Sequence, residues 1–235
     1  MNAAVTTDFH SHILPRADHG SDSRKTSIRQ LEIMASCGIE RVVATPHFYP
    51  MGDNVASFLE NRDGSAAALS ERIRGKAGFP DICLGAEVLV CEGMETMEGI
   101  EKLAIRGTRC MLLEMPLTKW SSRLFDTVEA IVSRGIYVVI AHIDRYPASQ
   151  VDSLLELPVR AQLNPGAFFG VIRRGNAERW LSSGKVVAVG SDLHGADEKC
   201  YRDFVTATKR LGAYTERIDK SMKHILSRAK VLLPT

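Results

Sequence analysis

Six of the seven histidines in this 235-residue chain stand in short motifs with acidic residues, and most of these motifs directly follow an apolar run. In chain order the motifs are Asp8-Phe9-His10-Ser11-His12, Asp18-His19, Ala44-Thr45-Pro46-His47, Gly85-Ala86-Glu87, Leu112-Leu113-Glu114, Ala141-His142 and Gly190-Ser191-Asp192-Leu193-His194. Only His224 falls outside the pattern. Imidazole nitrogens and carboxylate oxygens are common metal ligands. A fold that brings several strand ends together would therefore assemble a site for more than one metal ion.

Composition narrows the class of protein. Apolar residues make up 45% of the chain and charged residues 25%, which is typical of a soluble globular protein. The net charge of +2 implies no strong pull toward nucleic acid or a membrane surface. No apolar run approaches the ~20 residues of a membrane span, and no basic segment followed by an apolar stretch indicates a signal peptide.

The five cysteines are odd in number and form no Cys-x-x-Cys pair, so we expect a reduced, cytoplasmic protein. None of them is followed six positions later by arginine, which excludes the usual cysteine-based tyrosine phosphatase mechanism.

Short runs rich in valine, isoleucine and leucine alternate with helix-like segments. A strand is expected near Val5–His10, and six more at Arg41–Thr45, Ile82–Gly85, Cys110–Glu114, Tyr137–Ala141, Val159–Leu163 and Lys185–Val189. Helices are expected at Ser23–Cys37, Val55–Lys76, Ser121–Arg134, Asn176–Ser183, Glu198–Leu211 and Thr215–Ala229. Glycines 38, 135, 184 and 212 follow helical stretches, where a left-handed residue caps a helix end.

Alternating strands and helices predict a parallel sheet with helices outside. About seven strands favour a barrel over an open sheet, and no linker or repeat divides residues 1–235, so a single domain is predicted. In αβ barrels chemistry collects at the carboxyl ends of the strands. An acidic residue or a histidine stands at the carboxyl end of most of the predicted strands. An open sheet would instead concentrate its ligands at a single crevice.

Taken singly, each motif has a structural alternative. His10 and His12 are two apart, so a strand puts both imidazoles on one face, yet a hydrogen-bonded strand end has the same pattern. His19 lies in a loop, where Asp18 could ligate a metal or orient His19. His47 and His142 follow strands, and a lone histidine there is more often structural.

The acidic motifs have the same two interpretations. Glu87 and Glu114 end apolar runs, so each needs either a cationic side chain or a metal as partner. A glutamate can also bridge two ions, one on each oxygen. Asp192 and His194 repeat the two-residue spacing of the first pair. Together the motifs favour the metal site over independent structural roles, with Gln162 and Asn164 lining the same pocket.

The ordered motifs resemble the PHP (polymerase and histidinol phosphatase) superfamily. The stretches that carry the resemblance are His-Ser-His-Ile-Leu-Pro, Ala-Thr-Pro-His, Gly-Ala-Glu, Leu-Leu-Glu, Ile-Ala-His-Ile-Asp-Arg-Tyr, Gln-x-Asn and Gly-Ser-Asp-x-His. The chain is most similar to the bacterial manganese-dependent protein-tyrosine phosphatases of capsule and exopolysaccharide operons. Because the motifs run from His10 to His194, the resemblance covers most of the chain.

This resemblance implies a distorted (β/α)7 TIM-like barrel that holds three divalent metal ions, with Mn²⁺ expected and iron or zinc as alternatives. By motif position, the implied ligands of the first ion are His10, His12, Glu87 and Asp192. Glu87 would bridge to a second ion that Glu114 and His142 complete, and the implied ligands of the third are His19, His47 and His194.

Two positions depart from the family pattern. The subfamily usually has Asp-Asp-Gly where this chain has Asp18-His19-Gly20. The resemblance implies that His19 replaces a carboxylate ligand with an imidazole. The arginine expected after the last motif is missing, and Lys199 occupies its place with Arg202 nearby. A lysine is a point charge rather than a bidentate fork, which predicts weaker phosphate binding.

The resemblance implies phosphomonoester hydrolysis, in which a metal-activated hydroxide attacks phosphorus. Asp192, His194 and Arg145 are the predicted catalytic residues, and Arg145 with Lys199 would bind the phosphate. The expected substrate is a phosphotyrosine protein, namely a tyrosine autokinase of capsule or exopolysaccharide biosynthesis. The alternatives are a small-molecule phosphatase of the histidinol-phosphate type and a metal-binding barrel with mainly a binding role. No nucleic-acid partner is expected, and the sequence leaves a homo-oligomer open.

Overall fold

A computed structural model describes residues 2–232 of the chain. Within that range ten strands pair in parallel with their neighbours. They are β1 (Thr7–His12), β2 (Arg41–Ala44), β3 (His47–Phe48), β4 (Asp81–Leu84), β5 (Glu87–Leu89), β6 (Cys110–Glu114), β7 (Tyr137–Ile140), β8 (Arg160–Leu163), β9 (Val186–Val189) and β10 (Leu193–His194). Each of the seven expected strands is present, and β1 lies two residues later than predicted.

The ten strands form two sheets, ordered β10-β1-β2-β4 and β3-β5-β6-β7-β8-β9. Three strands bend and so contribute to both sheets, because the chain runs from β2 into β3, from β4 into β5 and from β9 into β10 across only a few residues. Pro46 lies in the first bend and has no N–H for a ladder. Counting each bent pair as one strand gives seven positions, and the β10–β1 pairing closes the ring. The expected distorted (β/α)7 barrel is confirmed.

Seven helices surround the barrel within the described range. They are α1 (Arg24–Ser36), α2 (Val55–Ile73), α3 (Ser122–Ser133), α4 (Ala148–Leu154), α5 (Val171–Ser182), α6 (Glu198–Arg210) and α7 (Thr215–Ile225). Four of the helices begin at an N-cap residue whose side chain accepts a hydrogen bond from a backbone N–H of the first turn. These residues are Ser23, Asn54, Ser121 and Asp197. Gly38, Gly135 and Gly184 have positive φ after α1, α3 and α5, as the cap signal predicts.

Two helices differ from expectation. The sequence pattern does not predict α4, because its seven residues are too short to show helical periodicity. Helix α5 begins at Val171 rather than Asn176, since Gly175 and the exposed first turn resemble a loop in the sequence. Helix α7 ends at Ile225, and a 3₁₀ turn at Leu226–Arg228 completes the segment expected as helix up to Ala229.

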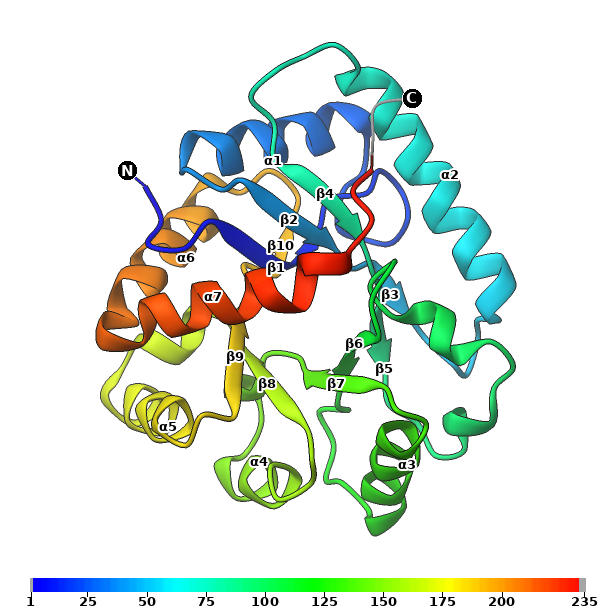
Figure 1. Ribbon diagram of the computed structural model, residues 1–235, viewed down its shortest axis with the longest axis vertical. Coiled ribbons are helices and arrows are strands. Elements are labelled where there is room, and N and C mark those ends of the chain that lie inside the picture. The colour runs from blue at the N-terminus through cyan, green and yellow to red at the C-terminus, as the bar shows by residue number, and fades with distance from the viewer. Residues whose placement is uncertain (1, 233–235) are drawn as a thin grey trace.

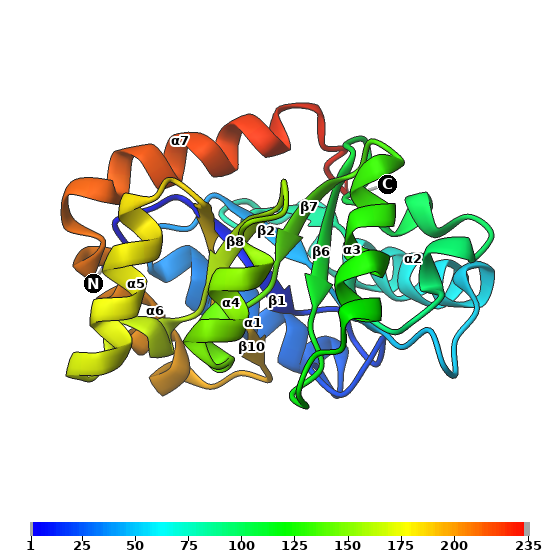
Figure 2. The same ribbon diagram turned by 90° about the horizontal axis from the view of Figure 1, so that it is seen from below.

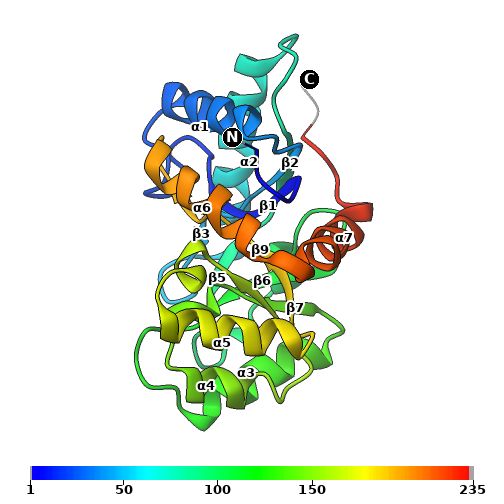
Figure 3. The same ribbon diagram turned by 90° about the vertical axis from the view of Figure 1, so that its left-hand side faces the viewer.

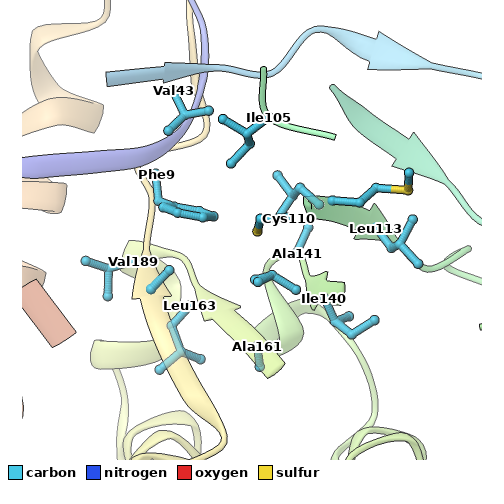
Figure 4. Packing of buried hydrophobic residues seen from close by; sticks show 14 of the residues in the cluster. Phe9, Val43, Ile105, Cys110, Leu113, Ile140, Ala141, Ala161, Leu163 and Val189 are labelled. Atoms are coloured by element: carbon cyan, nitrogen blue, oxygen red, sulfur yellow. The ribbon is translucent and has the colours of Figure 1, made fainter. Parts of the chain in front are cut away.

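The interior of the barrel is filled with apolar side chains. Phe9 of β1, Val43 of β2, Leu163 of β8 and Val189 of β9 converge there and are almost fully buried (Figure 4). Such packing leaves no channel through the barrel, as is usual for this class of fold. Polar chemistry is therefore confined to the two ends.

The two ends of the barrel differ. In the view down the barrel, α7 crosses in front of the strands (Figure 1). The perpendicular views place α7 on one side only, with the loops after β1 and β6 at the opposite end (Figures 2 and 3). Those loops follow the carboxyl ends of the strands, so this end is open for a site.

No helix between residues 2 and 232 combines the length and the hydropathy needed to cross a bilayer. The prediction of one domain over residues 1–235 includes residues 1 and 233–235, which lie outside the described part of the chain, and it stays a prediction.

Candidate metal centre

The predicted motifs meet at the open end of the barrel. Strand pairing places His12 beside His194, and His47 beside Glu87. The breaks in the barrel contribute to this, because β3, β5 and β10 each begin after a break and each carries a residue of the motifs. Glu114 ends β6 and His142 follows β7 by two residues. Side chains from six of the seven strand positions thus converge.

The first group consists of His10, His12, Glu87 and Asp192, all buried, with one ligand atom of each within 4.8 Å of the others. Glu87 Oε2 lies 3.1 Å from His10 Nε2 and 3.3 Å from His12 Nε2. Asp192 Oδ1 lies 3.6 Å and 3.3 Å from the same two nitrogens. This group contains the same four residues that the family resemblance implies for one ion.

A second group shares Glu87 with the first. His47, Glu87 and Glu114 lie within the same 4.8 Å limit. The other carboxylate oxygen, Glu87 Oε1, is 2.7 Å from His142 Nε2, and Glu114 Oε1 is 3.7 Å from that nitrogen. Each oxygen of Glu87 thus faces different nitrogens, as a bridging carboxylate requires.

The third group contains His12, His47 and His194. The His19 ring centroid is 4.7 Å from those of both His47 and His194, but this side chain is exposed and lies outside the compact group. The Asp18 carboxylate faces His12. Its Oδ2 accepts a 2.6 Å hydrogen bond from His12 Nδ1 and a 3.0 Å bond from the His47 backbone N–H. In the described part of the chain Asp18 contacts His12 and the backbone of His47, and its role beside His19 stays a prediction.

Hydrogen bonds on the outer nitrogens fix the orientation of the rings. His10 Nδ1 lies 3.3 Å from Gln162 Oε1, and His194 Nδ1 lies 3.0 Å from the Asp192 carbonyl. Because these oxygens accept, each Nδ1 carries a proton, and Nε2 is the atom left to bind a metal ion once it has lost its own proton. The bond from His12 to Asp18 has the same effect.

Several buried nitrogen and oxygen atoms of the cluster lack a hydrogen-bond partner, as expected of residues that bind metal ions. His47 Nδ1, Glu87 Oε2 and His194 Nε2 are buried and make no hydrogen bond. His10 Nε2 and His12 Nε2 lie only 3.2 Å apart, so two potential metal-binding nitrogens converge there. Buried polar atoms without partners are costly and rare, whereas a cation among them would satisfy all at once. The donor set of imidazoles and carboxylates fits Mn²⁺, iron or zinc.

In the protein without metal, the buried carboxylates and the inner imidazoles stabilise each other's charged forms. Burial opposes ionisation of Glu87 and Asp192, but His10 and the neighbouring donors outweigh it and lower both pKa values. Burial likewise disfavours a charged His10, yet Glu87 and Asp192 raise its pKa. The pKa of His12 is raised well above its ordinary value by Asp18, Asp192 and Glu87 against the same burial effect.

The outer residues show the opposite shifts. Burial lowers the pKa of His47 to about 4, and burial is also the main cause of the lowered pKa values of His142 and His194. Burial, followed by the charge of Glu87, raises the pKa of Glu114 to about 7. Burial and then Glu114 raise the pKa of Tyr49 at the mouth of the centre to about 12.

Four supporting residues lie behind the cluster. Gln162 Oε1 accepts from the His142 backbone N–H at 2.7 Å, and Asn164 Nδ2 donates to Asp192 Oδ2 at 2.9 Å. Sequence spacing indicates both as pocket residues. It misses Tyr146, whose hydroxyl is 3.2 Å from His142 Nδ1, and Asp8, which accepts from the Ser191 N–H at 2.8 Å. The only available signal for Asp8 is its two-residue spacing from His10.

The candidate phosphate-binding cations lie in different places. Arg145 Nη2 donates to Asp192 Oδ2, with the side chain 47% exposed at the rim of the centre. Lys199 instead lies on the surface of α6, 3.3 Å from Asp203, and Arg202 faces Glu198 at 3.8 Å. The role expected of Lys199 thus stays a prediction that no contact among residues 2–232 supports.

Backbone geometry also marks the centre. Three non-glycine residues in the described range have positive φ, and His142 and Asp192 are two of them. Such conformations are costly and persist where the surrounding structure holds them. Gly190, next to this turn, lies so close to β1 that an added Cβ would be 2.5 Å from His10 Cβ and 2.9 Å from His10 N.

We expect Gly190→Ala to disturb His10 and to reduce metal binding, although Gly190 offers no ligand, because the clash involves backbone that cannot move aside. Metal content and thermal unfolding would measure the effect. Gly64→Ala is the control: nothing lies within 4 Å of its Cβ position in α2, so this substitution should stabilise the helix by ~1 kcal/mol. A Gly190→Ala protein with full metal content would contradict the expectation.

Comparison with known proteins agrees with the geometry. The model of the CpsB/CapC capsular polysaccharide synthesis family matches residues 6–222. The tyrosine-protein phosphatase CpsB of Streptococcus pneumoniae is 26% identical over 212 residues, covering 82% of this chain and 84% of that protein. In structure, the chain is similar to a protein from a study of YwqE from Bacillus subtilis and CpsB from Streptococcus pneumoniae, described as unique metal-dependent tyrosine phosphatases. That likeness has a TM-score of 0.76 and 19% identity and covers 96% of each chain. The chain belongs to the CpsB/CapC family of capsular polysaccharide synthesis proteins.

Proposed function

We propose that this protein is a metal-dependent phosphatase that hydrolyses phosphotyrosine in a protein of capsule or exopolysaccharide synthesis. The observation that carries the proposal is that the two carboxylate oxygens of Glu87 face different histidine nitrogens. Membership of the CpsB/CapC family supports it, as does the name of the pneumococcal relative.

The proposal assigns three divalent ions to the centre. His10, His12, Glu87 and Asp192 would hold one, and Glu87, Glu114 and His142 a second. His47 and His194 would hold the third with either His19 or His12; the compact grouping favours His12, and the family pattern favours His19. Ions so held would lower the pKa of a bound water and neutralise charge on phosphate oxygens.

Arg145 would bind the phosphate from the rim. Its guanidinium is half exposed and is held by Asp192 at the edge of the cluster, so it can offer N–H donors to a phosphate oxygen. The tyrosine leaving group has a pKa of ~10, so the phenolate departs with little help from a general acid. A serine alkoxide would need more, which favours phosphotyrosine as the substrate.

The proposed partner is a tyrosine autokinase that acts in polysaccharide export. The family description supports a role in capsule synthesis, and a kinase that phosphorylates its own tyrosines supplies the phenolic ester that this centre would cleave. A cytoplasmic location is proposed with it.

The test compares turnover of a phosphotyrosine peptide, the matching phosphoserine peptide and histidinol phosphate by the Mn²⁺-loaded protein. The proposal predicts that the phosphotyrosine peptide has the highest kcat/KM. A higher value for histidinol phosphate would favour the small-molecule alternative. Absence of turnover with all three would favour a barrel whose role is binding.

A further inference from the structure

Most of the exposed large apolar side chains lie at the end of the barrel that carries the metal centre. Among residues 2–232 they are Tyr49, Met51, Leu117, Tyr137, Val171 and Ile172. Five of the six lie after the carboxyl end of a strand, namely after β3, after β6 and at the start of α5; Tyr137 alone begins a strand. Exposed apolar side chains that gather in one region mark a contact surface. Their position connects this surface with the substrate of the metal centre.

Tyr49 contacts His47, one of the residues of the cluster. Its ring stacks on the His47 imidazole with centroids 5.3 Å apart and an interplanar angle of 15°. His47 Nδ1 is in turn 3.1 Å from Glu87 Oε2. The Tyr49 backbone N–H donates to Asp53 Oδ2 at 2.9 Å, which fixes the loop. The ring is nevertheless 40% exposed, so it offers apolar surface directly above the buried ligands.

Met51 lies two residues after Tyr49, and Leu117 lies three residues after Glu114. Strands β3 and β6 lie on either side of β5, and their ends come together, since His47 Nδ1 is 3.7 Å from Glu114 Oε2. The segments that carry Met51 and Leu117 therefore leave the barrel from neighbouring positions. Their side chains are 85% and 77% exposed, so both can contact a bound ligand.

We propose that Tyr49, Met51 and Leu117 form an apolar wall that holds the aromatic ring of the phosphotyrosine substrate while its phosphate reaches the buried cluster. This inference rests on the proposed function and names residues that determine its specificity. A phosphorylated phenol has a flat apolar ring next to the ester oxygen, and such rings stack on aromatic and aliphatic side chains. An alkyl phosphate carries no ring at that position, so it gains no stacking contact from the wall. Arg145 at the rim complements the phosphate charge.

The test measures kcat/KM for phenyl phosphate and for glycerol phosphate and takes their ratio, with Mn²⁺-loaded protein. Tyr49→Ala should lower this ratio roughly three- to tenfold, and a Tyr49→Ala/Leu117→Ala double variant should lower it further. Tyr49→Phe keeps the ring and should retain the ratio. Tyr137→Ala is the matched control, because Tyr137 is also 40% exposed but lies at the other end of β7.

An unchanged ratio of the two kcat/KM values in Tyr49→Ala would overturn the proposed wall. If the oligomeric state of that variant also changed, the surface would be a contact between copies of the chain. Wild-type protein that fails to hydrolyse phosphotyrosine peptides would instead overturn the proposed function. The two failures are therefore distinguishable.

Discussion

Replacing His12 or Asp192 by alanine is expected to reduce turnover of a phosphotyrosine peptide by about a thousandfold or more. His12 belongs to two of the three ligand groups. Asp192 faces His10 and His12 with one carboxylate oxygen and Arg145 with the other. Loss of either side chain removes a donor from the proposed metal centre, and a loss of ~4 kcal/mol in transition-state stabilisation corresponds to a factor of that size. Steady-state kinetics with Mn²⁺ in excess would measure the effect.

The fold should survive both substitutions, because the barrel interior is packed by apolar residues that neither side chain contributes to. Circular dichroism and thermal unfolding would verify this. His224→Ala is the matched control, since His224 is an exposed histidine on α7, at the opposite end of the barrel. Full activity in His12→Ala or Asp192→Ala would show that the site assignment is mistaken.

Much of the fold was predictable from local pattern. The apolar run Cys110–Glu114 has the same bounds as β6, and valine- and isoleucine-rich runs predict the other long strands within two residues. A buried parallel strand needs a continuous apolar segment, so the signal is strong. Convergence of the histidine and acid motifs followed from the rule that barrel chemistry collects at the carboxyl ends of strands. Their role as ligands stays a prediction.

Other features depend on contacts between distant segments. Strands β3, β5 and β10 have only two or three residues each, and they exist because the barrel closes around them rather than because of their own sequence. The partner of Asp18 was not predictable for the same reason. Asp18 is next to His19 in sequence, but the loop folds back so that its carboxylate meets His12. The Tyr146 contact with His142 likewise depends on the left-handed turn at His142.

Removal of the metal ions is expected to abolish turnover while leaving the barrel folded. Without cations, Glu87 and Asp192 are balanced by protons on His10 and His12, whose pKa values are raised by those carboxylates. Their raised pKa values mean that protons compete with metal ions for these imidazoles, and a metal ion must displace the protons. Metal affinity should therefore rise as the pH is raised, and binding should release protons to the buffer.

The central claim is that phosphotyrosine hydrolysis takes place at this histidine and carboxylate cluster. The most direct measurement titrates chelator-treated protein with Mn²⁺ and follows bound metal and phosphotyrosine-peptide turnover in the same samples, with the His12→Ala protein in parallel. The account predicts no turnover without metal, recovery in proportion to bound metal in the wild type, and no recovery in His12→Ala. Turnover that persists in fully metal-free protein would contradict it.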